Sequence, residues 1–293
     1  MTSHVKAMFS ARPAELGIMA AVTGSLFLSF DSVFIRLSGI SGFDTAFLFG
    51  IFSAISMSLF IQTTDPRGLV VTLKESGWPA VVSGLLIVGS ALSVILSIKH
   101  TAVANTMVIL SGRPVMTALA CWLILKEKPT TSLWLAITGV IIGISTVASG
   151  SLQSGTILGD LFAFSAVIFL ALNGTLWRCY KNISRIVIVG LGGFFLALTM
   201  SIPAEPSTYS ADTWIIMAAM GLFSAPLGRV LNATATRYIP AAEAAMIGLS
   251  SVILASLWAY LFFNEIPSLN TIIGGIIVIS TITTYIMIKR RQN

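Results

Sequence analysis

The chain has 293 residues, of which 56% are hydrophobic and only 10% are charged, less than half the charged fraction of a typical soluble domain. Its net charge of +6 comes from single Lys and Arg residues between apolar runs, a distribution that excludes a nucleic-acid-binding surface. Two Cys and two His are too few for a disulfide framework or a structural metal site, so we expect no cofactor. Most soluble enzyme classes are therefore excluded, and the composition indicates an integral membrane protein.

Apolar runs of 17 residues or more, separated by Pro, Gly and charged residues, divide the chain into ten predicted membrane spans. Backbone groups in lipid must pair within their own segment, and the alternating pattern of a β-barrel is absent, so we expect helices. The spans cover residues 16–35, 43–61, 78–98, 103–125, 132–148, 157–177, 186–202, 214–236, 241–263 and 269–288. The predicted fold is an all-α integral membrane bundle.

The basic residues indicate how these spans are oriented. If the N-terminus is cytoplasmic, thirteen of the seventeen Lys and Arg residues fall in cytoplasmic segments, and only Arg36 and Lys99 fall outside. This asymmetry follows the positive-inside rule. We therefore expect residues 1–15 and 289–293 to be cytoplasmic ends of a multi-pass protein of the bacterial inner membrane.

Three short motifs recur in the same order in the two halves of the chain. They are Asp31-Ser-Val-Phe-Ile-Arg36 with Asn173-Gly-Thr-Leu-Trp-Arg178, Glu127-Lys-Pro129 with Glu265-Ile-Pro267, and Ser132-Leu133 with Ser268-Leu269. Their offsets are 142, 138 and 136 residues. They predict a five-helix duplication, residues 16–150 and 157–288. An odd number of helices in each copy inverts the second copy across the membrane.

Ten helices in two repeats, each with an acid-x-Pro tripeptide after its fourth helix, resemble the drug/metabolite transporter superfamily. The resemblance covers residues 16–288 and is best for the EamA-type branch of bacterial exporters, within which the aromatic amino-acid exporters are the nearest group. It implies two inverted repeats around a central cavity, with helices three, four, eight and nine prominent in the cavity wall.

Ionisable side chains inside a span are costly and mark functional sites, and Arg113 is the clearest example. It lies ten residues into the fourth span, ~15 Å along the helix axis, and so near the midplane. Pro114 follows directly and predicts a bend. A guanidinium there suits a substrate's carboxylate or phosphate. The alternative is a structural arginine that bonds neighbouring backbone carbonyls.

A second arginine, Arg229, shares one face of the eighth span with Asn232 and Thr236. Pro226, one turn earlier, predicts a second bent helix. The pattern indicates a polar stripe along a cavity, with Arg229 and Asn232 in contact with the substrate. The alternative is that Arg229 snorkels toward the cytoplasmic surface.

Two acids are candidates for ion coupling. Asp31 lies in the outer third of the first span, and Glu243 lies in the predicted first turn of the ninth span. Either carboxylate could change its protonation state during transport. Alternatively, Asp31 pairs with Arg36, and Glu243 offsets the dipole of its helix.

Neutral polar side chains complete the predicted substrate site: Asn105, Ser111, Ser250 and Ser251. In the repeat alignment Asn105 falls opposite Glu243, and Arg113 falls opposite Ser251. The two halves would then present different chemistry to one space. The alternative for the serines is a bond to the backbone of the preceding helical turn.

Other residues are expected to serve packing and anchoring. Gly139-x-x-x-Gly143 in span five and Gly274-Gly275 in span ten predict a close helix contact or a dimer contact. A monomer or a homodimer is therefore expected. Trp78, Trp122, Trp214 and Trp258 are interpreted mainly as anchors at the membrane surface.

Together these features predict a secondary transporter that exports amino acids or related small metabolites, with the lipid bilayer and the substrate as its partners. The chain has no nucleotide-binding motif for ATP-driven transport, and its membrane acids lack the His partner that an enzyme would need. A transporter of nucleotide sugars or phosphorylated metabolites is the alternative on the same fold, since two central arginines suit phosphate. A structural or regulatory membrane protein is the remaining alternative.

Overall fold

The computed structural model describes residues 13–65, 68–126, 131–180, 184–235, 238–239, 244 and 247–292, and in these residues all regular secondary structure is helical. Seven helices are long and apolar enough to cross a membrane, or eight if the bent pair α6 and α7 counts as one span. Two shorter apolar helices, Ile186–Met200 and Ser250–Phe263, occupy positions of the seventh and ninth predicted spans. The chain is therefore an all-α multi-pass membrane bundle, and the count of ten spans stays a prediction.

The described helices follow one another through short connections. In chain order they are α2 (Pro13–Ser29), α3 (Asp31–Leu37), α4 (Gly42–Thr64), α5 (Gly68–His100), α6 (Val103–Ser111), α7 (Arg113–Leu125), α8 (Thr131–Ser154), α9 (Ile157–Cys179), α10 (Arg185–Met200), η1 (Pro206–Thr208), α11 (Ala211–Ala218), η2 (Ala219–Ser224), α12 (Ala225–Ala235), α14 (Ser250–Phe263) and α15 (Leu269–Gln292).

Three of the predicted spans contain a local irregularity, which we call an interruption, although only the fourth is bent by as much as 40°. The first is divided at Phe30 into α2 and α3, and the fourth bends by 40° at Gly112 between α6 and α7. The second interruption confirms the bend predicted beside Pro114, whose missing N–H breaks the helical hydrogen-bond ladder. The eighth passes through the π-helix η2 just before Pro226, where a bend was expected. A π-helical turn inside a helix often marks a functional site.

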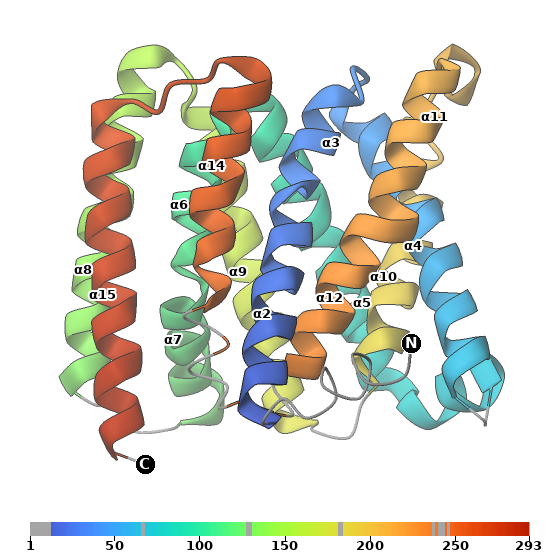
Figure 1. Cartoon of the computed structure of the whole chain (residues 1–293), viewed down its shortest axis with the longest axis horizontal. Helices are drawn as coiled ribbons and strands as arrows, with labels where there is room; N and C mark the ends of the chain where they lie inside the picture. The colour runs from blue at the N-terminus through green and yellow to red at the C-terminus, as the bar shows by residue number, and fades with distance from the viewer. Residues whose placement is uncertain are drawn as a thin grey trace, which may run out of the picture.

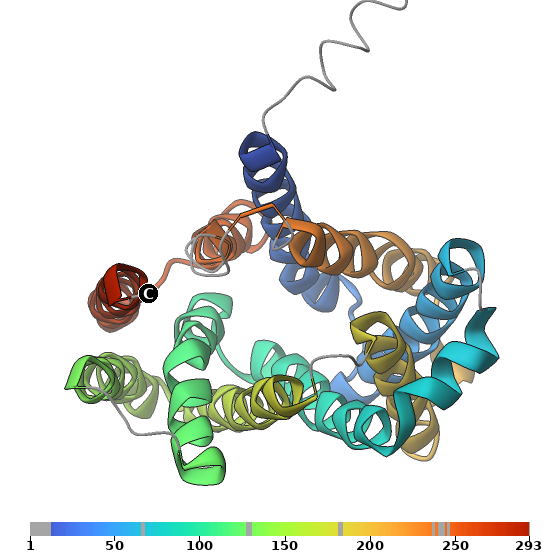
Figure 2. The same ribbon diagram turned by 90° about the horizontal axis from the view of Figure 1, so that it is seen from below.

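Most helices form a ring, and α8 with α15 stands as a pair at one edge of it (Figure 2). Extensive contacts join α2 to α12, α5 to α9, α4 to α10 and α8 to α15. α2 begins and α15 ends at the same end of the bundle (Figure 1). We call this end the terminal end and the opposite end the distal end.

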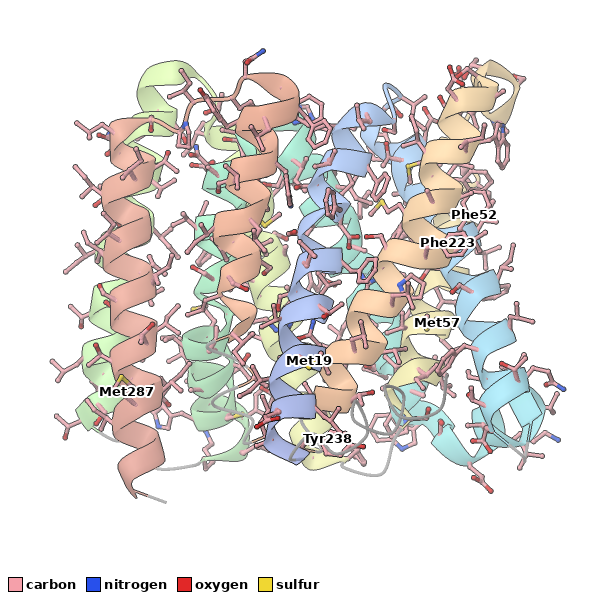
Figure 3. The ribbon with its side chains drawn as sticks, in the orientation of Figure 1. Met19, Phe52, Met57, Phe223, Tyr238 and Met287 are labelled. Carbon is pink, nitrogen blue, oxygen red and sulfur yellow. The ribbon has the colours of Figure 1, made fainter. Side chains whose placement is uncertain are left out.

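The sides of the bundle are apolar. Met19 and Phe223, both labelled in Figure 3, are 59% and 63% exposed, and Leu135 and Ile276 on the outer pair of helices are exposed to a similar degree. Soluble proteins rarely expose so much apolar surface. This surface suits the hydrocarbon core of a bilayer.

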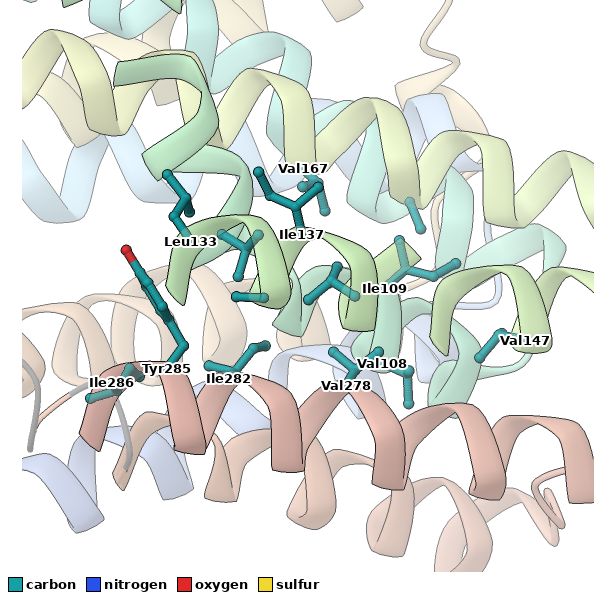
Figure 4. Close-up of a cluster of buried hydrophobic side chains, with 14 residues drawn as sticks. Val108, Ile109, Leu133, Ile137, Val147, Val167, Val278, Ile282, Tyr285 and Ile286 are labelled. Carbon is teal, nitrogen blue, oxygen red and sulfur yellow. The ribbon is translucent and has the colours of Figure 1, made fainter. Parts of the chain in front are cut away.

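Small residues let α8 and α15 approach closely. A Cβ atom on Gly274 would lie 2.6 Å from the carbonyl oxygen of Gly143, too close for any side chain. A buried cluster that includes Ile109, Ile137 and Ile282 surrounds this contact and ties the pair to α6 and α9 (Figure 4). Two of the glycines predicted to pack, Gly143 and Gly274, therefore pack against one another within a single chain, whereas Gly139 faces Thr281 and Gly275 faces Val108.

Gly143→Leu is expected to destabilise the protein strongly, because the new side chain would meet the α15 backbone, which cannot rotate away. Overpacking costs about 1–3 kcal/mol even where neighbours can shift. Thermal unfolding in detergent should show a clear drop in the melting temperature. Gly248→Leu is the matched control, since a Cβ atom there meets no atom of the described residues within 4 Å. An unchanged melting temperature for Gly143→Leu would contradict this packing.

Candidate functional site

A polar centre lies where the first and eighth spans are interrupted. α2 ends at Ser29, and Asp31 is the first residue of α3. Ser224, the last residue of the π-helix, directs its hydroxyl to the Asp31 Oδ1 atom at 3.1 Å and to the Phe27 carbonyl oxygen at 2.8 Å. One serine therefore joins the two interruptions and holds the carboxylate in place.

Arg229 brings a positive charge to the same centre. Its guanidinium lies 5.5 Å from the centre of the Phe49 ring, a cation–π distance, and its Nη1 atom is buried with no hydrogen-bond partner in the part of the chain that the structure describes. Arg229 attracts the Asp31 carboxylate electrostatically, although the two do not form a direct ion pair. This inward position differs from that of a snorkelling side chain, so that alternative is wrong. A buried charged donor without a partner is costly, and a bound anionic group would satisfy it.

Two aromatic rings border the centre. Trp258 of α14 donates its Nε1 hydrogen to the Ser29 Oγ atom at 2.9 Å and stacks on Phe30 with ring centroids 4.6 Å apart. The interpretation of Trp258 as a surface anchor is therefore wrong, because its indole N–H is bonded at the interruption of the first span. The rings provide an apolar face beside the charged groups.

A similar bond joins the two halves in the opposite sense, from a serine of the first half to an amide of the second. Ser83 of α5 donates to the Asn173 Oδ1 atom of α9, and the Trp177 Nε1 atom donates to the Ser83 Oγ atom at 2.8 Å. Asn173 lies 142 residues after Asp31, and Ser224 lies 141 residues after Ser83. The halves thus share a serine bond to an Asp or Asn, but only the first half has the acid.

Arg113 occupies a different part of the ring. It is the first residue of α7, directly after the 40° bend, and it is half-buried with an interaction partner. α7 packs against α9 and α8, whereas α12, which carries Arg229, packs against α2 (Figure 2). The structure therefore places the two predicted arginines on different sides of the ring.

The other predicted site residues are bonded locally or lie elsewhere. Asn232 donates to the Gly228 carbonyl oxygen at 3.0 Å and lies against Gly24 of α2. The hydroxyls of Ser111, Ser250 and Ser251 each donate to a carbonyl oxygen three residues earlier, in line with the backbone alternative. Glu243 and Thr236 lie outside the described residues.

Asn105 belongs to a polar network near the distal end. Its amide donates to the hydroxyls of Thr101 and Ser151 and accepts a hydrogen bond from the hydroxyl of Thr271. Three protein side chains therefore bond the Asn105 amide. The Thr101 hydroxyl also donates to Asp160 Oδ1 at 3.0 Å. This network joins α6, α8, α9 and α15, which gives Asn105 a structural role that its polarity alone did not indicate.

An ion pair links the two halves at the distal end. Arg36 Nη2 lies 2.8 Å from Glu265 Oε1 and also donates to the Thr101 carbonyl oxygen at 2.8 Å. Glu265 Oε2 accepts a hydrogen bond from the Val103 N–H at 3.1 Å. This N–H lies at the start of α6, where backbone donors have no partner within the helix. The alternative in which Asp31 pairs with Arg36 is wrong, because the ion pair of Arg36 is with Glu265 and its Nη2 atom also bonds the Thr101 carbonyl oxygen.

The comparisons with known proteins agree with this architecture. The model of the EamA-like transporter family matches residues 15–149 and again residues 157–287. The chain belongs to this family. This EamA-like transporter is similar to the uncharacterized transporter YyaM of Bacillus subtilis, 25% identical over 245 residues that cover 79% of this chain and 75% of YyaM. It is also similar to solute carrier family 35 member G1 of Homo sapiens, 25% identical over 61% of this chain and 54% of that protein.

A solved crystal structure has the same fold. It aligns with a TM-score of 0.65 at 16% identity and covers 94% of this chain and 98% of its own. Membership of a transporter family, together with the apolar helices, makes the protein a multi-pass membrane transporter. A transporter family also agrees with a non-enzymatic role.

Proposed function

We propose that this EamA-like transporter is a secondary transporter that exports amino acids or related small metabolites across the bacterial inner membrane. One observation carries the proposal: the buried Nη1 donor of Arg229 has no hydrogen-bond partner among the described residues, and Arg229 attracts the oppositely charged Asp31 where two spans are interrupted. A solute with a carboxylate and an ammonium group finds a partner for each. π-Helical turns and helix breaks often lie at functional sites, in secondary transporters among other proteins.

Helix packing supports two inverted repeats, residues 16–150 and 157–288, that rock to give alternating access. In the duplication, α2 is the counterpart of α9, α5 of α12, α4 of α10 and α8 of α15. Exchanging each helix for its counterpart turns the contact of α2 with α12 into the contact of α9 with α5. The contacts of α4 with α10 and of α8 with α15 map onto themselves. The Ser224–Asp31 and Ser83–Asn173 bonds exchange in the same way, and the family model matches each half. Such a pseudo-two-fold arrangement suits alternating access.

Transport of nucleotide sugars or phosphorylated metabolites is the second candidate. Arg113 and Arg229 would both suit phosphate. However, Asp31 interacts with Arg229, and a carboxylate repels a phosphate that carries more than one negative charge. The acid beside the arginine therefore favours amino acids.

Counterflow in proteoliposomes separates the two candidates. Vesicles containing the purified protein are loaded with unlabelled amino acids or with unlabelled nucleotide sugars, and uptake of the labelled form is followed. Accumulation of at least one labelled amino acid above protein-free vesicles is the expected result. Accumulation of nucleotide sugars alone would replace the proposal with its alternative.

The proposed orientation has the terminal end in the cytoplasm, because thirteen of seventeen basic residues are assigned to that side. Cys179, an exposed thiol at the end of α9, should then react with an impermeant reagent only after the cytoplasmic face is opened. Ser207→Cys, in the exposed turn η1, should react from the periplasmic side of spheroplasts in a Cys179→Ser background. The reverse labelling pattern would contradict the orientation.

Arg113 is proposed to contact the substrate's anionic group at another point of the ring, away from Arg229, because it lies at the bend of the fourth span. Arg113→Ala is expected to weaken substrate binding by about ten- to hundredfold, the value of a charged hydrogen bond of roughly 1.5–3 kcal/mol. Arg113→Lys should be less severe, since it loses only the planar guanidinium. A well-folded Arg113→Ala protein with wild-type affinity would limit Arg113 to a structural role.

A further inference from the structure

The two serine bonds differ in one respect that bears on substrate choice. In the second half, a neutral amide, Asn173, accepts the serine hydroxyl. In the first half, an acid, Asp31, accepts the equivalent bond from Ser224. Since an amide suffices to make this bond, the negative charge of Asp31 is not needed for it. The charge must be explained by something else that Asp31 contacts.

Within the described residues, Asp31 has a carboxylate oxygen left for another partner. The Ser224 hydroxyl bonds the Oδ1 atom, and no protein hydrogen bond reaches the Oδ2 atom. Arg229 acts on the carboxylate at longer range than an ion pair. The basic groups at the distal end are used elsewhere, since Arg36 pairs with Glu265 and Lys99 donates to Ser38 at 3.0 Å. A cationic group of a ligand would complete the coordination of Asp31.

The charge balance of the centre points to the same ligand. Asp31 and Arg229 together are neutral, and unbalanced charge inside a membrane protein is costly. A zwitterion keeps the centre neutral, because its carboxylate meets Arg229 and its ammonium meets Asp31. A monoanion would leave one excess negative charge.

We infer that Asp31 is the residue that selects zwitterionic substrates over monoanionic ones by binding their ammonium group. This inference rests on the proposed amino-acid transport and names the charge class that the site accepts. Removing the charge while keeping the shape should invert the preference. With Asp31→Asn, the positive charge of Arg229 stands alone and is balanced by a monoanion.

The experiment compares each amino acid with the 2-oxo acid that has the same side chain but lacks the ammonium group. The assay measures how strongly each compound inhibits counterflow of a labelled amino acid in proteoliposomes. The compounds are L-leucine, L-phenylalanine, L-threonine and the 2-oxo acid of each. The wild-type protein should prefer the amino acids. In Asp31→Asn the ratio of the two inhibition constants should fall by about ten- to hundredfold. Asp31→Glu keeps the charge and should retain the preference in part.

Asp160→Asn is the matched control, because Asp160 is another buried acid in a hydrogen-bond network but lies away from the centre. Its preference should equal that of the wild type. An unchanged preference in a folded Asp31→Asn protein would overturn the inference while leaving the proposed function intact. If Asp31→Asn misfolds, Asp31→Glu decides, because equal inhibition of that variant by the amino acid and by its 2-oxo acid would also overturn the inference. If the wild type exchanges no amino acid, the proposed function itself fails.

Discussion

Arg229→Ala is expected to reduce amino-acid counterflow by about ten- to hundredfold, because it removes the guanidinium whose buried Nη1 donor has no hydrogen-bond partner among the described residues and would meet the substrate's carboxylate. The same change leaves Asp31 without its opposite charge, so the empty centre also becomes unbalanced. Arg229→Lys should recover part of the activity, since an ammonium keeps the charge but not the planar geometry.

Thermal unfolding of the same variants shows whether the loss comes from binding or from folding. Phe49→Leu is a useful companion, because it removes the ring under Arg229 and keeps an apolar side chain of similar length. Its effect should be smaller, within about tenfold. Wild-type counterflow in a folded Arg229→Ala protein would exclude Arg229 from the substrate site.

Glu265→Gln is expected to open the distal end more often. The ion pair with Arg36 and the bond to the Val103 N–H join the second half to the first, and a rocking motion that opens this end must break them. Both side chains are largely shielded, at 27% and 21% exposure, so the pair is worth more than a surface pair. A shift in the open population on the order of tenfold is expected.

The shift can be read from a single thiol below the ion pair. Ser32, one turn before Arg36, is 1% exposed, so Ser32→Cys in a protein without Cys121 and Cys179 should react slowly. Adding Glu265→Gln should speed its labelling from the periplasmic side, whereas Glu205→Gln, an exposed acid at the same end, should not. Equal labelling rates with and without Glu265→Gln would rule out a closing role for this ion pair.

Much of the fold could be predicted because hydropathy directly reports which segments lie in lipid. The predicted spans 43–61 and 157–177 correspond to α4 (Gly42–Thr64) and α9 (Ile157–Cys179) within a few residues. The bend beside Pro114 could also be predicted, since proline acts through its own missing N–H. The interruption at Phe30 could not be predicted, because no Gly or Pro marks it. The residue that bonds there is Ser224, 193 residues after Asp31 in the sequence.

The site residues were harder to predict, because a side chain's role depends on partners from distant segments. Asp31 and Arg229 were visible as rare charges in apolar runs. Trp258 was misread, since its bond to Ser29 joins residues 229 apart in the chain. Asn105 has the polarity of a substrate ligand, but its partners come from two other spans and a turn, which no local pattern reveals.

Substrate protection of a thiol at the centre tests the central claim most directly. Asn232 is half-buried one turn from Arg229, and the smaller side chain of Asn232→Cys fits against Gly24. In a protein without Cys121 and Cys179, a transported amino acid should slow the reaction of this thiol with a thiol reagent by at least severalfold, and its 2-oxo acid should protect less. An unchanged reaction rate at saturating amino acid would contradict a substrate site between the first and eighth spans.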